Sequence, residues 1–519
     1  MSLQKKILLK TAHVGLSTLL SRLFGIVREI LMVRYLGASG LSDAFLTAYK
    51  IPNSLRKIFA EGALSAAFIP TVVHSIKKNN RDSIGGLMSL GFLFFEGTVL
   101  LLCAFIMYYA HDVISFIAPG FSPEQIDHTV PMVHILMPFI FFISSSALLA
   151  GAMQAVSHFF IPAFTPIIMN LIFIIGIITC LFFNLPVTAL CWFVLSSGIV
   201  HFIMHVITYI NLHFTFSMPT AHDFTLFKQI IGQFLLCLPS ISLMEIALFI
   251  DTSFASWLKP GSISLLFYAN RFIGIPLGVF AVAFSTILLP HFSRISAYSP
   301  KRLHFYLFES ARFIFWITIP VALLMAFFAN DIFSTIFLSK KFTIEQVREA
   351  GTILQTFLCG LFSFSLNKII LNIFYSMHAA WIPAIIALCT TTVNIILNIF
   401  FIEYFQTAGL ALATTCSSIL QTILFLTVLH KKYSFRLYLA RFMFFITRYS
   451  IQLILFSSLF IITYHMLYQL ILMTMPSYIA EFLLIKIGLW LWVGPLATLF
   501  FGLLWYLRSN FGIKIYFLG

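Results

Sequence analysis

Charged residues are scarce in this chain. Only 9% of its 519 residues are Asp, Glu, Lys or Arg, and 60% are hydrophobic, whereas soluble proteins carry about 25% charged residues. A soluble globular fold is therefore excluded. The formal net charge of +14 does not indicate nucleic-acid binding, because the basic residues are spread over many short polar breaks and form no single patch.

Sequence patterns for catalysis are also missing. No Walker motif occurs, which argues against direct use of ATP. The seven cysteines lack CxxC spacing, so we interpret them as small packing residues. The longest predicted outer loops, 110–130 and 331–349, are too short for an enzymatic domain, and no loop carries a metal or acid–base constellation. We therefore expect a transporter and no enzyme.

Long apolar runs follow one another almost from end to end. A bilayer core of about 30 Å needs about 20 apolar residues per helix, and this predicts an all-α membrane protein with fourteen spans. The approximate spans are 11–35, 42–73, 85–109, 131–156, 160–183, 187–211, 227–254, 264–290, 305–330, 350–376, 381–403, 408–430, 445–469 and 480–507.

Basic residues in the breaks predict the orientation of the chain. With a cytoplasmic N-terminus, sixteen Lys or Arg lie in cytoplasmic segments and four (Lys259, Lys340, Lys341 and Arg348) lie outside. This bias follows the positive-inside rule. Both termini are then cytoplasmic, and the number of spans is even.

A weak internal repeat relates the second and eighth spans. Ser65 and Pro70 recur as Ser285 and Pro290, an offset of 220 residues along the numbering. This predicts two six-helix lobes around a cavity, residues 1–215 and 216–432, followed by two C-terminal helices in 433–519. Pro52 and Pro276 interrupt corresponding helices of the two lobes, and such interruptions are typical of transporter binding sites. Alternatively, the matches arise by chance and the prolines only kink their helices.

Four arginines lie deep in the predicted spans 1, 2 and 8: Arg22, Arg28, Arg56 and Arg271. A buried charge needs a polar cavity or a partner, and guanidinium binds phosphate oxygens in a bidentate fork. They predict a cationic pocket for a phosphate or pyrophosphate headgroup. The alternative is structural pairing with helix carbonyls or with Glu29 and Asp43.

Other polar residues in the spans have two interpretations each. Asp43 is either a gate that forms an ion pair with a cavity arginine or the N-cap of its own helix. Lys57 and Glu61 form a possible i,i+4 pair, whereas Glu245 and Lys368 have no partner that the sequence identifies. A group of oxygen-bearing residues suits either Na⁺ binding or helix packing: Asp251, Asn394, Asn398 and Thr414.

Several segments resemble the MurJ (MviN) lipid II flippase family of the multidrug/oligosaccharidyl-lipid/polysaccharide (MOP) superfamily. They read "SRLFGIVRE" from Ser21, "SDAFLTAYKIPNSLRKIFAEGALSAAFIP" from Ser42 and "FYANRFIGIPLGVFAVAFSTILLP" from Phe267. The resemblance implies transfer of the undecaprenyl-pyrophosphate-linked peptidoglycan precursor, lipid II, from the inner to the outer leaflet of the bacterial inner membrane.

The resemblance also assigns residues. It implies functional roles for the four arginines and Asp43, a gating role for Glu61, and packing or cavity-shaping roles for further matching positions: Ser21, Gly25, Asn53 and Gly62. The chain departs from the family pattern at Asn270, at Asn398 and in "FYSMHAAWIP" from Phe374. A typical sodium site has an acid at the position of Asn398, so this departure argues against sodium coupling.

The expected mechanism is alternating access, with the headgroup in a solvated groove and the lipid tail in the bilayer. The membrane potential, worth about 2.3 kcal/mol per charge per 100 mV, or Na⁺ would drive it, and no other cofactor is expected. We expect a monomer whose partners are lipid II and membrane lipids. The alternatives are a flippase for another polyprenyl-pyrophosphate oligosaccharide and a multidrug antiporter.

Overall fold

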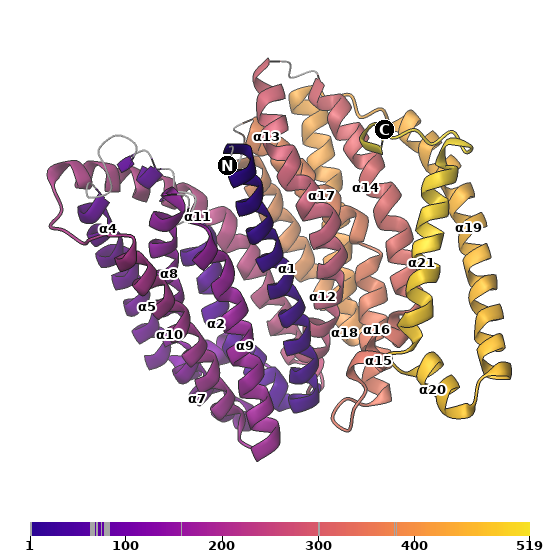
Figure 1. Ribbon diagram of the computed structural model, residues 1–519, viewed down its shortest axis with the longest axis horizontal. Helices are drawn as coiled ribbons and strands as arrows, with labels where there is room; N and C mark the ends of the chain where they lie inside the picture. Colours follow the sequence, from indigo (N-terminus) through magenta and orange to yellow (C-terminus); the bar gives the residue numbers. More distant parts are fainter. Residues whose placement is uncertain are drawn as a thin grey trace. The chain divides into compact units, whose positions relative to one another are not determined.

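The computed structural model describes residues 3–62, 68, 71–73, 75–76, 84–156, 158–298, 302–377, 379 and 381–518, and for some of these, among them 3–19 and 60–62, only the backbone. Helices make up nearly all of these ranges (Figure 1). Their regular structure outside helices is one isolated β-bridge, between Ser339 and Phe342. The all-α prediction is therefore confirmed.

The chain divides into two compact units, residues 1–264 and 265–519. The elements of unit 1 are α1 (Leu3–Leu36), α2 (Gly40–Arg56), η1 (Lys57–Gly62), α4 (Gly85–Gly91), η3 (Phe92–Glu96), α5 (Gly97–Tyr108), α6 (Ala110–Ile117), α7 (Pro123–Leu136), α8 (Pro138–Ala155), α9 (Phe160–Phe183), α10 (Val187–Asn211), α11 (Ala221–Ser256) and the first turn of α12 (Ser262–Pro276).

Unit 2 contains the rest of α12 and the following elements: η4 (Leu277–Val282), α13 (Ala283–Tyr298), α14 (Arg302–Phe327), α15 (Ala329–Phe337), α16 (Ile344–Leu358), α17 (Leu361–Ser376), α18 (Trp381–Tyr433), α19 (Leu439–Thr474), α20 (Ser477–Ile485), α21 (Leu489–Tyr506), η5 (Leu507–Ser509) and η6 (Tyr516–Leu518).

Helix packing sets the framework of unit 1. Helix α1 packs along α9, α9 packs against α10, and α2 packs against α7 and α8. Helix α11 contacts α4, α6 and η1, so it belongs to unit 1 by its contacts. The lobe boundary at residues 215 and 216 is defined by a sequence repeat and not by contacts, so it stays a prediction.

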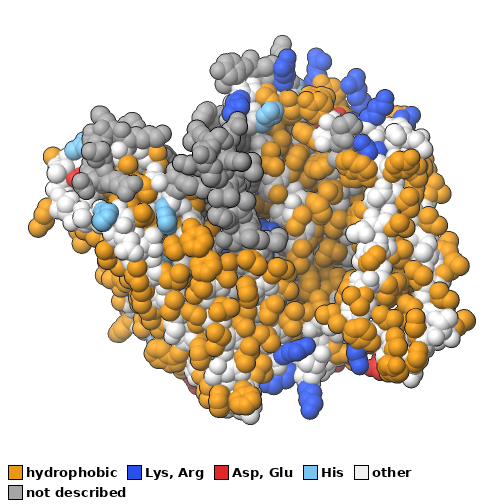
Figure 2. Space-filling view, viewed as in Figure 1, with side chains coloured by type: hydrophobic (Ala, Val, Ile, Leu, Met, Phe, Trp, Pro, Cys, Tyr) orange, Lys and Arg blue, Asp and Glu red, His pale blue; other side chains and the backbone are white. Residues whose placement is uncertain are grey.

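The core of unit 2 lies between α13, α14, α17 and α18. Phe292, Ile314, Ile369 and Phe374 are fully buried there, and Phe425 is almost fully buried. Apolar side chains also cover much of the visible surface (Figure 2), with exposed fractions of 74% for Leu101, 79% for Phe182 and 73% for Ile287. A helix that is apolar all round is stable when lipid or protein surrounds it.

Both interrupting prolines precede a turn of π-helix. Helix α2 contains Pro52 and continues directly into η1, while α12 ends at Pro276 and continues directly into η4. A proline removes one helical hydrogen bond, and local π-type adjustments restore backbone pairing in membrane helices. The two predicted interruptions therefore have the same local form.

The described residues include nine helices that are long and apolar enough to cross a membrane, or ten when the α16–α17 pair, bent by 45°, counts as one span. Helix α18 contains two of the predicted spans, and Gln406 inside it has φ 49° and ψ −125°, which breaks the helix between them. A multi-pass membrane protein is thus confirmed. The number fourteen stays a prediction.

Candidate functional site

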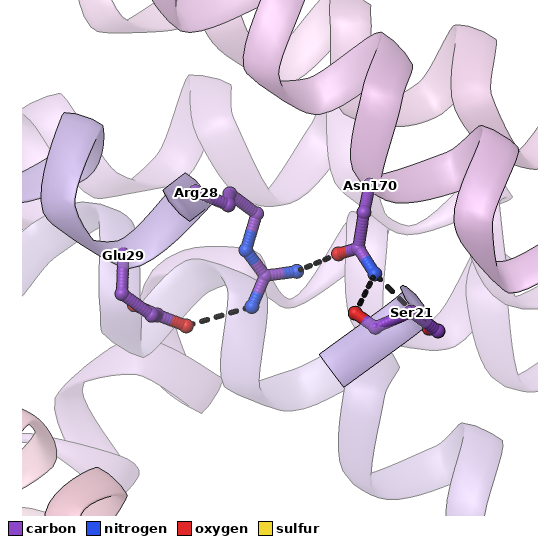
Figure 3. Close-up of polar contacts among 4 residues, drawn as sticks. All are labelled: Ser21, Arg28, Glu29 and Asn170. Atoms are coloured by element: carbon purple, nitrogen blue, oxygen red, sulfur yellow. Dashed lines mark hydrogen bonds and ion pairs between the residues drawn. The ribbon is translucent and has the colours of Figure 1, made fainter. Parts of the chain in front are cut away.

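Arg28 is held in place by a polar network between α1 and α9 (Figure 3). Its Nη1 donates to Asn170 Oδ1 at 3.1 Å, and its Nη2 donates to Glu29 Oε1 at 2.7 Å. The guanidinium also lies 5.0 Å from the centre of the Phe173 ring. The side chain is 15% exposed. This burial and pairing fix the direction of the Arg28 guanidinium.

Asn170 connects two turns of α1. Its Nδ2 donates to the backbone oxygen of Ser21 at 3.2 Å while its Oδ1 accepts from Arg28. Ser21 and Arg28 are seven residues apart, about two helical turns, and therefore lie on one face of α1. Asn170 and Phe173 are three residues apart, about one turn, and are therefore neighbours on one face of α9. Asn170 was not among the residues predicted from the sequence, although it lies in an apolar helix where a polar side chain signals a function or an interhelical contact.

The other three predicted arginines have different surroundings. Arg22 is exposed on α1. Arg56 is half-buried at the end of α2, where its Nε donates to Asn53 Oδ1 at 3.1 Å. Arg271 is exposed in unit 2, and its guanidinium lies 4.8 Å from the centre of the Phe267 ring. Three of the four arginines thus belong to unit 1, and their joint action on one ligand stays a prediction.

Asp43 is buried and holds the first turn of α12, with 3% of its surface exposed. Its Oδ2 accepts from the Gly261 amide at 2.7 Å, and its Oδ1 accepts from the Ser264 amide at 2.8 Å and the Ser264 hydroxyl at 2.5 Å. The N-cap of α2 is Ser39, whose side chain accepts from the Ser42 amide. The interpretation of Asp43 as the cap of its own helix is therefore corrected, because the carboxylate caps a different helix.

Two lysines on α2 and η1 reach the neighbouring helix α11. Lys50 Nζ donates to the Leu248 backbone oxygen at 2.6 Å and to the Thr252 hydroxyl. Lys57 Nζ contacts both oxygens of Glu245, at 2.9 and 3.1 Å. Glu245, for which the sequence identified no partner, is thus the ion-pair partner of Lys57.

Asp251 also belongs to this row of charges, because its carboxylate interacts electrostatically with Lys50. The predicted Lys57–Glu61 pair falls partly outside the described side chains. The backbones of Glu61 and Gly62 form the end of η1, but nothing is described of the Glu61 carboxylate.

Three of the residues predicted for Na⁺ contact one another in unit 2. Asn394 Nδ2 donates to Thr414 Oγ1 at 3.5 Å, and Asn398 Nδ2 donates to Asn394 Oδ1 at 3.2 Å. Asn398 is fully buried, and its Oδ1 accepts no hydrogen bond from the described residues. An unpaired buried oxygen is the kind of ligand that a hard cation takes, and Na⁺ binding by these residues stays a prediction. No group of three or more His, Cys, Asp or Glu in the described part of the chain could hold a metal.

Gly25 and Asn270 have open surroundings. No described atom outside its own helical turns lies within 4 Å of the point where a Gly25 side chain would begin, so Gly25 makes no close helix contact in this conformation. Asn270, one of the departures from the family pattern, is exposed on α12.

Comparison with known proteins identifies the family. Residues 32–485 match the family model described as "Lipid II flippase MurJ". The chain is 31% identical over 460 residues to a "Probable lipid II flippase MurJ" of Buchnera aphidicola subsp. Acyrthosiphon pisum, which covers 87% of this chain and 89% of the relative.

Solved structures agree on the fold. The chain is similar to "Lipid II flippase MurJ, inward closed conformation", with a TM-score of 0.76, 24% identity and coverage of 96% of this chain and 99% of the other. It is also similar to an inward-facing multidrug resistance MATE family transporter of the MOP superfamily, with a TM-score of 0.63, 14% identity and coverage of 78% and 93%. The predicted MOP-type fold is thereby confirmed, and the chain belongs to the MurJ lipid II flippase family.

Proposed function

We propose that this protein transfers lipid II from the cytoplasmic to the outer leaflet of the bacterial inner membrane, with both of its own termini in the cytoplasm. The observation that carries the proposal is the match to the family model, which extends over residues 32–485. The 31% identity to the Buchnera relative, which covers 87% of this chain and 89% of that relative, supports it. The protein acts as a transporter and needs no catalytic group of its own.

The arginines supply the chemistry for an anionic headgroup. Arg28 is pre-oriented by Asn170, Glu29 and Phe173, so less side-chain entropy is lost when it binds a phosphate oxygen. We assign the pyrophosphate contacts of the transport cycle to Arg22, Arg28, Arg56 and Arg271. A guanidinium stays charged in an apolar environment, which an ammonium does less readily.

Alternating access requires contacts that form in one state and break in another. Asp43 is a candidate for this role, because its carboxylate holds the first turn of α12 through two backbone amides and one hydroxyl. Release of these bonds would free the start of α12 during the cycle. The exposed surface of Arg271 on the same helix then makes α12 an element that both holds cargo and responds to the gate.

The driving force is assigned to the membrane potential, with Na⁺ as the candidate coupling ion at Asn394, Asn398 and Thr414. The unpaired Oδ1 of Asn398 supports an oxygen ligand there. Asp251, the fourth predicted ligand, interacts electrostatically with the Lys50 ammonium in unit 1. Because this ammonium balances the charge of the carboxylate, Asp251 does not require a sodium ion.

The test is exposure of lipid II on the outer face of bacteria depleted of their own flippase. Expression of this protein should restore exposure, and an Arg271→Ala variant should not. Arg436→Ala removes an exposed cation of the polar break before α19 and serves as the matched control with normal exposure. Correct membrane insertion without any exposure of lipid II would contradict the proposed cargo.

A further inference from the structure

A cavity at one end of unit 2 combines arginines with aromatic walls. It has a volume of about 540 Å³ and lies between α14, the start of α19 and the C-terminal residues 512–513. In Figure 1 the C-terminus is drawn beside the ends at which α14 and α19 begin. Lys and Arg side chains gather over this end in Figure 2. Three arginines line the cavity: Arg312, Arg441 and Arg448.

Each of these guanidinium groups lies against an aromatic ring. The distances from the guanidinium carbon to the ring centre are 5.3 Å for Arg441 on Tyr438, 4.1 Å for Arg448 on Phe444 and 4.9 Å for Arg312 on Phe445. A ring that covers the flat face of a guanidinium leaves its N–H edges available. These edges match the oxygens of a phosphate.

One of the three cations is neutralised by the protein itself. Arg312 Nη1 contacts Glu309 Oε1 at 2.6 Å, and the other Glu309 oxygen accepts from the Tyr516 amide at 2.8 Å. Arg312 also donates to the backbone oxygen of Lys514. These bonds tie the C-terminal segment to α14 and thereby fix one wall of the cavity.

The remaining two cations carry the net charge of the cavity. Arg441 and Arg448 form no ion pair with any residue that the structure describes. They are seven residues apart on α19, about two helical turns, and so present their charges on one face. The cavity therefore offers two uncompensated guanidinium groups to an anion.

The position of the cavity along α19 indicates which class of anion it can bind. Arg448 lies nine residues after the first residue of α19, about 13 Å along the helix, and α19 is one of the helices able to cross a membrane. Met443 and Phe444 beside it are 61% and 58% exposed. A bound ligand therefore meets cations on one side and a lipid-facing apolar surface on the other.

We propose that this cavity binds the phosphate diester of an anionic glycerophospholipid, with Arg441 and Arg448 on the phosphate and the acyl chains along the exposed apolar face of α19. Membrane phospholipids place their phosphate at the depth where arginine side chains reach the interface. A free phosphate ion would gain nothing from Phe444 and Met443. The site is separate from the arginines assigned to the cargo and does not depend on lipid II transport.

The test is native mass spectrometry of the full-length protein in detergent with equal amounts of phosphatidylglycerol and phosphatidylethanolamine. The wild type should retain phosphatidylglycerol in preference. Arg441→Gln/Arg448→Gln should lower the bound fraction about tenfold or more, because each substitution removes charged hydrogen bonds. Arg436→Gln, which removes a nearby exposed cation that does not line the cavity, should bind like the wild type.

A second variant keeps the test informative if the double glutamine variant does not fold. Arg441→Lys/Arg448→Lys retains the charge but loses the two-pronged hydrogen bonding of guanidinium to phosphate. Its phosphatidylglycerol binding should therefore lie between that of the wild type and that of the double glutamine variant. The lipid should also raise the melting temperature of the wild type more than that of the lysine variant. Equal retention of both lipids, displacement of phosphatidylglycerol by millimolar inorganic phosphate, or an equal loss in Arg436→Gln would overturn the proposal.

Discussion

At the scale of single residues, Asn170 is the side chain that orients Arg28. Asn170→Ala removes the acceptor of Arg28 Nη1 and the donor to the Ser21 carbonyl. Loss of a hydrogen bond to a charged group costs about 1.5–3 kcal/mol, so lipid II exposure in the depletion assay should fall about tenfold. Membrane abundance of the variant should stay close to that of the wild type.

A polar residue elsewhere on α9 separates this effect from general damage to the helix. Thr179 is half-buried, and its hydroxyl donates to the Ile175 carbonyl of its own helix at 2.8 Å. Thr179→Ala should therefore keep full lipid II exposure. Normal exposure in Asn170→Ala would mean that Arg28 needs no fixed direction.

The Lys57–Glu245 pair predicts a rescue by charge exchange. Lys57→Glu places two carboxylates at a contact of 2.9 Å, and the melting temperature of the purified protein should fall. The exchange variant Lys57→Glu/Glu245→Lys should recover part of the loss, since contacting pairs have coupling energies of about 0.5–3 kcal/mol. Additive losses in the double variant would show that the two side chains are not coupled.

The residues of the candidate site were predictable from sequence to different degrees. Arg28 and Asp43 stand out because a charge within an apolar run is costly and calls for a partner. The identity of the partner is not predictable in the same way. Glu245 lies 188 positions from Lys57 along the chain, and only the packing of α11 on η1 brings them together. Asn170 is uncharged and therefore gave a weaker signal.

At the scale of elements, Asp43 acts as a cap for α12. Asp43→Ala removes the acceptor of the Gly261 and Ser264 amides, and loss of an N-cap costs about 0.5–2 kcal/mol. Hydrogen exchange of a peptide covering residues 261–264 should therefore become faster. Ser39→Ala removes the side-chain cap of α2 and should speed exchange near Ser42 while residues 261–264 stay protected.

Exchange at 261–264 that is unchanged in Asp43→Ala would contradict the capping role and leave a gating role to be explained by other contacts. A gate predicts a further difference, because Asp43→Ala should also alter lipid II exposure, whereas Ser39→Ala should not. The two readouts thus separate a cap from a gate.

Helix breaks were predictable where side chains or backbone geometry enforce them. The polar gap between the two spans of α18 coincides with the left-handed Gln406, and Pro52 and Pro276 mark elements that contain π-helical turns. The π-helical form itself was not predictable, because apolar periodicity does not distinguish one inserted residue in a helix. The bend between α16 and α17 was not predictable either, because Gly360 lies between these helices within one continuous apolar run.

At the scale of the whole molecule, family membership and fold follow from sequence patterns that extend over most of the chain. Motifs around Ser21, Ser42 and Phe267 carried the resemblance, and the family match over residues 32–485 bears it out. The cooperation of arginines from both units is a different matter. This cooperation depends on conformations that change during transport. It is not predictable from the sequence, because the same sequence adopts all of these conformations.

Membrane orientation provides the last prediction, because transport from the inner to the outer leaflet has meaning only for a defined orientation. The excess of Lys and Arg on one set of loops predicts that the loop with Lys340 faces outward and the loop with Lys431 faces the cytoplasm. In a cysteine-free background, Lys340→Cys should react with a membrane-impermeant maleimide in intact cells, and Lys431→Cys should react only after the inner membrane is permeabilised. Removal of the native thiols is necessary because Cys359 and Cys389 are exposed. Labelling of Lys431→Cys in intact cells would contradict the predicted orientation. The arginines on α1 would then have to bind their cargo from the opposite side of the membrane.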